Sequence, residues 1–375
     1  MDRRRCLNRK QMMSNSGLEN STKKVHMMQL AEYREELRKN PQLHSLFIEM
    51  TGLCNEHCRH CGSSCGDYEV KNQLSREEIE HLLDTVKEDF DISRLRLCIT
   101  GGEPLLRKDF FEIMEYANNH GYTWGMTSNG ILIDRECAKR LKETGMKTIS
   151  VSLDGLRENH EWFRCVKGSY DKAVEGIENL LSVGGFLHVQ ITTVVHHKNI
   201  GELEEMYETF RKIGVRSWRV INIEPIGRAL ESGDLALTAD EYRYMFDFIE
   251  KKRFLDPHFE VTYGCSHFLG VQRERESRKW YFLCNAGVYT ASVMYNGDVG
   301  ACLDIERRAE TIQGNIRERR FSDIWKNEFE IFRTDYRKCG PCKDCKDYDF
   351  CVGDAYHTWD FDKMEPRLCM RDMLK

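Results

Sequence analysis

The chain lacks the features that would place it in a membrane or on nucleic acid. Its 375 residues include no run of about eighteen apolar residues, the length that spans a bilayer. The formal net charge is only −5, which gives no cationic footprint for nucleic acid. The amino-terminal MDRRRCLNRKQMM is basic but has no apolar stretch behind it, so it is not a secretory signal. These absences predict a cytoplasmic protein with no nucleic-acid or membrane partner.

Proline is also scarce, at 6 residues, whereas cysteine is abundant. A hydrophobic content of 41% is enough for a sizeable core and excludes a wholly disordered chain. The 16 cysteines do not suit a disulfide framework in a reducing cytoplasm, where grouped thiols more often bind metal. Three lie close together as Cys54, Cys58 and Cys61, and seven more fall between Cys284 and Cys369.

Residues 45–225 alternate short apolar runs with amphipathic segments, which is the pattern of βα units on a parallel sheet. A capping box of Ser75 and Glu78 opens the first of the intervening helices. Six strands with crossover helices form either a doubly wound sheet or an incomplete barrel, and periodicity does not choose between them. The strands are predicted at residues 45–50, 94–100, 122–128, 147–153, 188–195 and 217–223.

After about residue 255 the predicted strands become short and are separated by turns. Asn296-Gly297 predicts a tight hairpin in this part of the chain. We expect a helix at about residues 26–39 that packs on the first domain, unless the first residues are partly disordered. The predicted division is an amino-terminal extension, an α/β domain and a cysteine-rich domain, at residues 1–44, 45–255 and 256–375.

The first cysteine group follows directly on the first predicted strand. Cys54, Cys58 and Cys61 are separated by three residues and then by two. Three thiolates from one loop can hold three irons of a cubane cluster and leave the fourth iron open to a ligand, whereas an ordinary 4Fe–4S cluster takes four cysteines. Zinc knuckles usually show paired two-residue spacings, and bacterial ferredoxins repeat that spacing with a trailing proline. Neither pattern fits, and Cys65 is interpreted as a nearby buried thiol.

Polar and glycine-rich motifs follow the next strands, where parallel sheets bind their ligands. Two glycines after the second strand allow the backbone to approach a ligand closely, and Glu103 offers a carboxylate to an ammonium group. A further loop, Glu224-Pro225-Ile226-Gly227-Arg228, follows the sixth strand. The candidate ligand-binding residues at these strand ends are Gly101, Gly102, Glu103, Pro104, Ser128, Asn129, Ser152 and Asp154.

This combination resembles the radical S-adenosylmethionine (SAM) superfamily. The resemblance implies a partial (β/α)6 TIM-like barrel, an α/β fold, with a catalytic 4Fe–4S cluster on Cys54, Cys58 and Cys61. It also implies that SAM chelates the open iron, that the strand-end residues bind SAM, and that one electron cleaves SAM to a 5′-deoxyadenosyl radical that abstracts hydrogen. A flavodoxin or ferredoxin is the implied low-potential electron donor.

The carboxy-terminal cysteines resemble the SPASM extension of radical SAM enzymes, which carries two auxiliary 4Fe–4S clusters. Carried over by position, Cys284 and Cys302 hold the first auxiliary cluster, while the second is held by Cys342, Cys345, Cys351 and Cys369. The sequence departs from the family where Ala355 replaces an expected cysteine. Cys339 or Cys265 can substitute for it, or the first auxiliary cluster has an open iron or is absent. A zinc-ribbon domain is the alternative for the whole region.

The resemblance favours an enzyme that modifies a peptide or protein, such as a maturase of ribosomally made peptides that forms a thioether or another cross-link. One alternative is oxidation of a sulfatase Ser or Cys to formylglycine. That sub-class has an Asp directly after the second cysteine of the first auxiliary site, where this chain has Leu303 followed by Asp304. A small-molecule reaction in haem or cofactor synthesis is a third possibility. A non-catalytic electron-transfer protein, which would not bind SAM, is a fourth.

Overall fold

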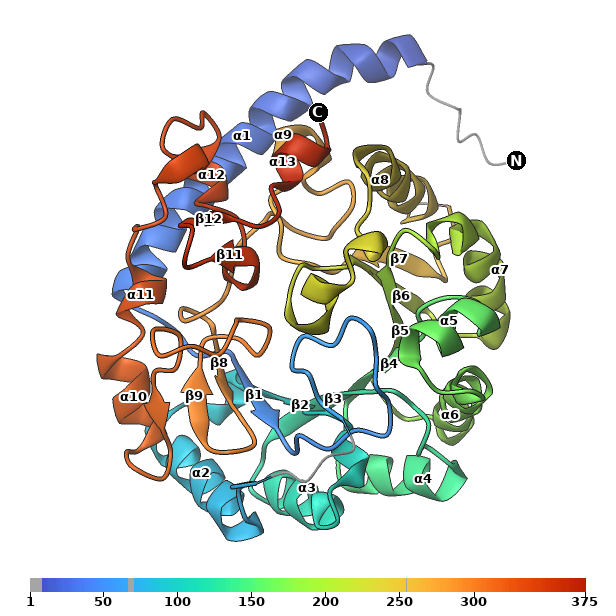
Figure 1. The fold of residues 1–375 in the computed structure, drawn as a ribbon, viewed down its shortest axis with the longest axis vertical. Coiled ribbons are helices and arrows are strands. Elements are labelled where there is room, and N and C mark those ends of the chain that lie inside the picture. Colours follow the sequence, from blue (N-terminus) through green and yellow to red (C-terminus); the bar gives the residue numbers. More distant parts are fainter. Residues whose placement is uncertain (1–8, 67–70, 254) are drawn as a thin grey trace.

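One curved sheet of ten strands forms the centre of the molecule, in the order β10-β9-β8-β1-β2-β3-β4-β5-β6-β7 (Figure 1). The computed structural model describes residues 9–66, 71–253 and 255–375, with side chains from residue 20 onward. Seven strands that are successive in the chain lie side by side and parallel. They are β1 Ser45–Glu49, β2 Arg96–Thr100, β3 Thr123–Ser128, β4 Thr148–Ser152, β5 His188–Val195, β6 Ser217–Asn222 and β7 Glu260–Tyr263.

The helices that connect these strands lie outside the curved sheet (Figure 1). Residues facing the helices are apolar, as where Trp218 of β6 packs edge-on against Phe210 with ring centroids 5.1 Å apart. The partial-barrel fold and its six predicted strands are therefore confirmed. The helices are α2 Arg76–Asp89, α3 Phe110–Asn119, α4 Arg135–Glu143, α5 Arg157–Arg164, α6 Ser169–Val183, α7 Leu203–Ile213 and α8 Ala239–Arg253.

The sheet continues beyond the six predicted strands into the cysteine-rich part of the chain. Strand β7 pairs with β6, and β8 (Thr290–Val293) pairs in parallel with β1 on the opposite side. Strand β9 (Asp298–Gly300) runs antiparallel to β8 across Asn296-Gly297, which confirms the predicted hairpin, and β10 (Gly314–Asn315) pairs with β9. One sheet thus contains strands from both sides of residue 255. The predicted domain boundary at this residue stays a prediction.

The remaining carboxy-terminal elements are short, and the long helix α1 (Arg9–Lys39) lies across them (Figure 1). Met27 of α1 belongs to an apolar cluster with Phe268 and Tyr348, and Arg34 donates 2.8 Å from Nη2 to the carbonyl of Asp349. The prediction that this helix packs on the first domain is therefore wrong. The short elements are α9 Gly270–Arg273, α10 Phe321–Asn327, α11 Glu330–Arg333, α12 Tyr348–Cys351, α13 Met370–Met373, β11 Trp359–Asp360 and β12 Glu365–Pro366.

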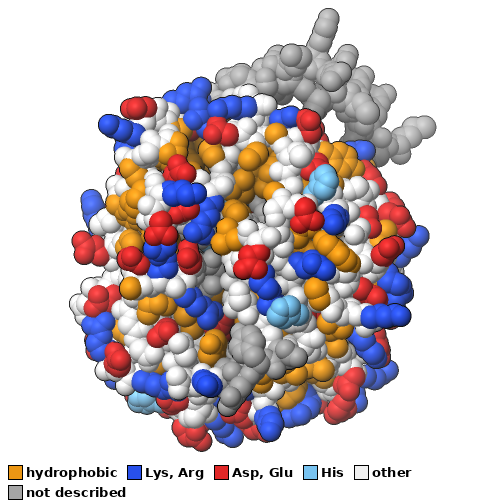
Figure 2. Space-filling view, viewed as in Figure 1, with side chains coloured by type: hydrophobic (Ala, Val, Ile, Leu, Met, Phe, Trp, Pro, Cys, Tyr) orange, Lys and Arg blue, Asp and Glu red, His pale blue; other side chains and the backbone are white. Residues whose placement is uncertain are grey.

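The surface mixes charges of both signs. Figure 2 shows Lys and Arg side chains interspersed with Asp and Glu side chains on the described part of one face. Within the described residues, no helix is long and apolar enough to cross a bilayer.

Candidate functional site

The three cysteines of the first group lie in one loop that leaves the carboxyl end of β1. The loop is closed where the amide of Cys54 donates 2.7 Å to the carbonyl of Gly66, and Cys58 is buried. Burial raises the pKa of the Cys54 thiol to about 11 and that of Cys58 well above its usual range. Thiolates at Cys54 and Cys58 are therefore unfavourable without a cationic partner, and the iron of an iron–sulfur cluster provides one.

Cys65 lies near the end of this loop and contacts Cys61. It is 2% exposed, as its interpretation as a buried thiol requires. A hydrogen bond with the Cys65 side chain lowers the pKa of the Cys61 thiol. Cys65 therefore favours the thiolate form of Cys61, which is the form that binds iron.

Arg228, in the loop after β6, binds the backbone of the loop that carries Cys54, Cys58 and Cys61, here called the cluster loop. Arg228 donates 2.7 Å from Nε to the carbonyl of Cys58 and 2.9 Å from Nη1 to the carbonyl of Cys65. Its own amide donates 3.2 Å to the carbonyl of Cys61. One arginine therefore fixes the backbone at three points between Cys58 and Cys65, which preorganises the spacing of the thiols.

The glycine-rich motif after β2 packs directly on the same loop. The amide of Gly102 donates 2.8 Å to the carbonyl of Thr51, and a Cβ at Gly102 would lie 2.0 Å from the carbonyl oxygen of Leu53. Only glycine allows this close approach. Pro104 begins the short 3-10 helix Pro104–Leu106, whose Leu105 amide donates 3.3 Å to the Glu103 carboxylate.

Glu103 accepts hydrogen bonds from Ser128 and Asn129, the expected SAM-binding residues after β3. Its carboxylate is fully buried and accepts bonds of 3.0 Å from Ser128 Oγ and 2.8 Å from the amide of Asn129. Asn129 in turn donates 2.6 Å from Nδ2 to Asn55 in the cluster loop. Burial raises the pKa of Glu103 to about 7. The predicted residues after β2 and β3 therefore lie together beside the cysteines.

Asp154, after β4, is connected to the cluster loop through Arg164. Its carboxylate is 0% exposed and accepts 2.7 Å bonds from the amide of Val194 and from Arg164 Nε. Arg164 also donates 2.8 Å from Nη1 to Glu56, between Cys54 and Cys58. Both Asp154 oxygens thus have protein partners, and contact of Asp154 with SAM stays a prediction, as does that of the half-buried Ser152.

Glu56 and Arg164 were not singled out in the sequence. Glu56 Oε1 is buried and has no hydrogen-bond partner among the described residues. An unpaired carboxylate oxygen beside the thiols fits a cationic ligand such as SAM. The donor set of three cysteines, together with this oxygen, therefore fits a SAM-binding iron–sulfur cluster. Its position between Cys54 and Cys58 was the one available sequence signal for Glu56.

The inner face of the barrel carries an arginine, Arg219. On β6, Trp218 and Val220 are fully buried toward the helices, so Arg219 points into the barrel. Arg219 donates 3.1 Å from Nε to Thr192 on β5 and makes no ion pair within the described residues. Burial lowers its pKa, which disfavours the charged form and leaves the guanidinium in need of an anion.

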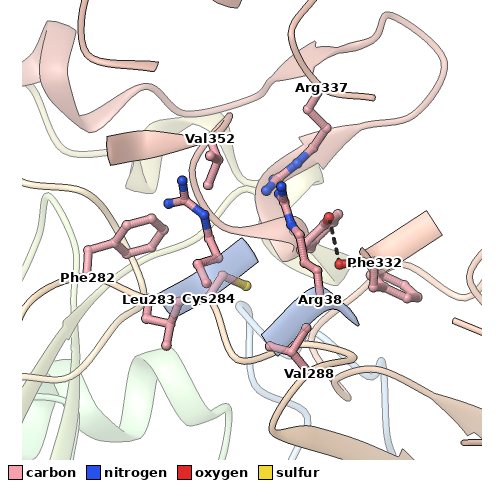
Figure 3. Close-up of a pocket in the computed structure, with 10 residues that line it drawn as sticks. Arg38, Phe282, Leu283, Cys284, Val288, Phe332, Arg337 and Val352 are labelled. Carbon is pink, nitrogen blue, oxygen red and sulfur yellow. Dashed lines mark hydrogen bonds between the residues drawn. The ribbon is translucent and has the colours of Figure 1, made fainter. Parts of the chain in front are cut away.

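Cys284 and Cys302 are neighbours beyond the barrel. Burial, the Asp304 carboxylate and Cys284 all raise the pKa of the Cys302 thiol. Figure 3 shows Cys284 beside a narrow pocket, which is lined by Arg34, Arg38, Arg337 and apolar side chains. Cationic side chains next to these thiols fit an anionic cluster, whose potential they would raise.

Cys342, Cys345 and Cys351 pack against the apolar cluster that contains Tyr348 and Val352. Burial and the neighbouring Cys345 raise the pKa of Cys342 to about 11, and Arg371 Nη1 lies 2.8 Å from Cys345 Sγ. Cys369 contributes to raising the pKa of Cys351, after burial and Asp354. The structure thus relates these cysteines in two neighbouring pairs, Cys342 with Cys345 and Cys351 with Cys369.

Cys339 and Ala355 lie in different surroundings. Cys339 Sγ is 3.3 Å from the carbonyl of Met364, and its charge also raises the pKa of Cys342. Ala355 is fully buried in the position where the family has a cysteine. The assignment of Cys339 to either auxiliary site stays a prediction.

Comparison with known families identifies the class of protein. The Radical SAM superfamily model matches residues 48–210, and the SPASM iron–sulfur cluster-binding domain model matches residues 284–346. The chain belongs to the radical SAM superfamily and carries a SPASM domain. It is an enzyme whose cofactors are 4Fe–4S clusters and SAM.

Particular relatives differ in what they do. AdoMet-dependent heme synthase of Oleidesulfovibrio alaskensis is 28% identical over 332 residues, covering 84% of this chain and 83% of that protein. Mycofactocin maturase MftC of Mycobacterium tuberculosis is 30% identical over 311 residues, covering 81% and 76%. The fold is similar to SuiB of Streptococcus suis bound to SAM, with a TM-score of 0.67 at 19% identity over 84% of this chain and 74% of that one.

Proposed function

We propose that this enzyme modifies a peptide or protein, as a maturase of ribosomally made peptides that forms a thioether or another cross-link. The supporting observation is the Arg219 guanidinium on the inner face of the barrel, which donates to Thr192 and has no ion pair within the described residues. A guanidinium in this position suits a carboxylate of the substrate. When bound, the clusters and SAM supply the one-electron chemistry and the hydrogen abstraction.

The relatives support a peptide substrate. MftC is named a maturase, and SuiB has been solved with its precursor peptide SuiA. We propose that Cys54, Cys58 and Cys61 hold the catalytic cluster and that two auxiliary clusters lie in the SPASM domain. A flavodoxin or ferredoxin in the cytoplasm is the proposed source of electrons.

Haem synthesis is the second candidate, because AdoMet-dependent heme synthase aligns with 84% of this chain. Porphyrin propionates are carboxylates too, so Arg219 suits them equally well. Formylglycine formation has less support. Asp304 is exposed, and its carboxylate lies 3.9 Å from Cys302 Sγ, beside a proposed cluster ligand.

The two candidates give different products. The reconstituted enzyme is incubated anaerobically with SAM and dithionite, either with the peptide encoded beside its gene or with iron-coproporphyrin III. We expect the peptide to lose two hydrogen atoms and the porphyrin to remain intact. Loss of carbon dioxide from the porphyrin, with an unchanged peptide, would replace the peptide proposal by haem synthesis. In either case Arg219→Met should raise KM for the true substrate more than it changes SAM cleavage without substrate.

A further inference from the structure

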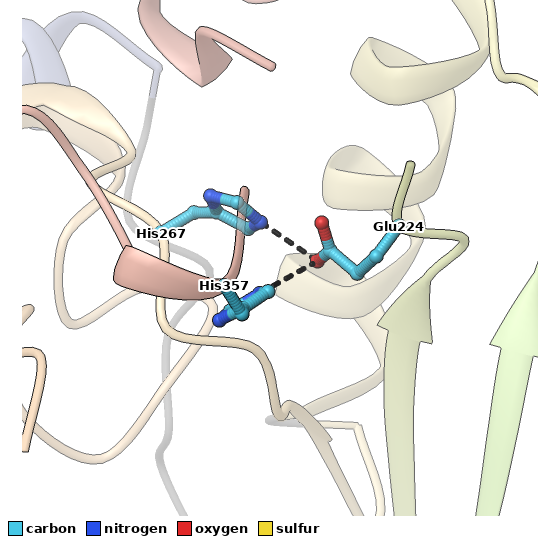
Figure 4. A group of neighbouring side chains, drawn as sticks. All are labelled: Glu224, His267 and His357. Carbon is cyan, nitrogen blue, oxygen red and sulfur yellow. Dashed lines mark hydrogen bonds and ion pairs between the residues drawn. The ribbon is translucent and has the colours of Figure 1, made fainter. Parts of the chain in front are cut away.

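Three side chains of the kinds that ligate metals converge, from distant parts of the chain, where the barrel meets the SPASM domain (Figure 4). Glu224 follows β6, His267 lies between β7 and α9, and His357 is in the 3-10 helix Tyr356–Thr358. One ligand atom from each lies within 4.8 Å of the other two. His267 Nε2 is 2.7 Å and His357 Nε2 is 3.7 Å from the same oxygen, Glu224 Oε1.

The group is buried and its polar atoms are incompletely paired. His267 is 0% exposed, and the side chains of His357 and Glu224 are 12% and 10% exposed. The second carboxylate oxygen, Glu224 Oε2, is buried and has no nitrogen or oxygen hydrogen-bond partner among the described residues, while the Cys265 thiol lies beside this carboxylate. A buried carboxylate oxygen without a partner is costly, and a bound cation removes that cost.

A second carboxylate orients His267. Its Nδ1 is 2.8 Å from Asp354 Oδ2, and the amide of Phe268 donates 2.9 Å to the other oxygen of Asp354. When Nδ1 carries the proton, the lone pair on Nε2 is directed at Glu224 Oε1. Two lone pairs then face each other across 2.7 Å, and their repulsion is removed either by a second proton on Nε2, which the raised pKa of His267 favours, or by a metal ion that both atoms bind. A carboxylate behind the histidine is the usual outer partner in metal sites.

We propose that Glu224, His267 and His357 bind one Zn²⁺ ion and leave a coordination position open. Two imidazoles and one carboxylate form a common zinc ligand set, and three protein ligands typically leave room for a water or another anionic donor. Mg²⁺ and Ca²⁺ prefer oxygen ligands throughout. Zinc has no redox chemistry, so it can lie near the barrel's radical chemistry without exchanging electrons. The site is independent of which substrate the enzyme takes.

The test measures zinc, iron and sulfide in the full-length reconstituted protein, after equilibration with zinc and removal of loosely bound metal. We expect one zinc per chain in the wild type and a loss of that zinc in His357→Ala and in Glu224→Gln, with iron and sulfide unchanged. His197→Ala is the matched control, because His197 forms an exposed pair of 2.7 Å with Glu241 and should keep the zinc. Asp354→Asn should weaken zinc binding about 10- to 100-fold.

Zinc-edge X-ray absorption of the wild type tests the site without any variant. Nitrogen and oxygen neighbours at about 2.0–2.1 Å support the proposal, whereas a shell made only of sulfur at about 2.3 Å would place the zinc on cluster cysteines and overturn it. Absence of bound zinc, retention of zinc in both ligand variants, or iron in place of zinc would also overturn it.

Discussion

Arg164 donates a hydrogen bond of 2.8 Å to Glu56, and this buried pair joins helix α5 to the loop that carries Cys54, Cys58 and Cys61. Arg164 also pairs with Asp154 at 2.6 Å, so one guanidinium connects the end of β4 to the backbone between Cys54 and Cys58. Through Arg164, Asp154 therefore helps to position the loop that carries Cys54 and Cys58.

We expect Arg164→Met to lower the free energy of unfolding by about 3–5 kcal/mol, because it leaves two buried carboxylates without their cation. The amount of iron bound at Cys54, Cys58 and Cys61 should also be lower in this variant. The measurement is anaerobic denaturant unfolding with iron analysis. Arg157→Met, in the same helix, is the control, since Arg157 forms an exposed pair with Asp171 and should change stability far less. Equal effects of the two variants would mean that the buried network has no special role.

Glu103→Gln should weaken SAM binding by about 1.5–3 kcal/mol, because a buried charge-assisted bond from the SAM amino group is lost. The measurement is equilibrium binding of SAM to the oxidised enzyme under anaerobic conditions. Glu112→Gln, in helix α3, serves as the control. Unchanged SAM affinity in Glu103→Gln would contradict the assignment of the glycine-rich motif to the SAM-binding site.

SAM affinity should also depend on pH through Glu103. Burial raises the pKa of this carboxyl group to about 7, so below that pH the neutral acid dominates and SAM must displace a proton. Affinity should therefore rise with increasing pH, by up to about tenfold per unit, and level off above about 7. Glu103→Gln should show no such rise. A wild-type profile that is flat across neutral pH would contradict this role.

Cys339→Ala tests whether the first auxiliary site has an open iron. Because Cys339 Sγ lies near the carbonyl of Met364, we expect the variant to keep its full iron content. A thiol-containing peptide should then perturb the spectrum of the first auxiliary cluster, since an open iron binds thiolate. Loss of a cluster's worth of iron, without a peptide effect, would show instead that Cys339 replaces the ligand missing at Ala355.

The barrel was predictable because its signals are local. Strands β1 to β6 are apolar runs of ordinary length, and the Ser75 capping box forms as expected, with Glu78 Oε2 accepting 2.7 Å from the Ser75 amide. The pairing of β8 with β1 was not predictable, because nothing in the hairpin around Asn296 specifies a partner so distant in the chain.

The candidate site was predictable only where its residues stand in motifs. Cys54, Gly102 and Glu103 have characteristic spacing, whereas Arg164 has no local signature and acts through side chains that folding brings to it. The same is true of His267 and His357, which lie 90 residues apart in sequence and approach one another only through tertiary packing.

The most direct test is dithionite-dependent formation of 5′-deoxyadenosine by the variant in which Cys54, Cys58 and Cys61 are all changed to Ala. The wild type, reconstituted anaerobically with more than one 4Fe–4S cluster, should cleave SAM. The variant should form no 5′-deoxyadenosine while it retains iron at the carboxy-terminal cysteines. Continued formation of 5′-deoxyadenosine by the variant would contradict the assignment of these three cysteines to the catalytic cluster.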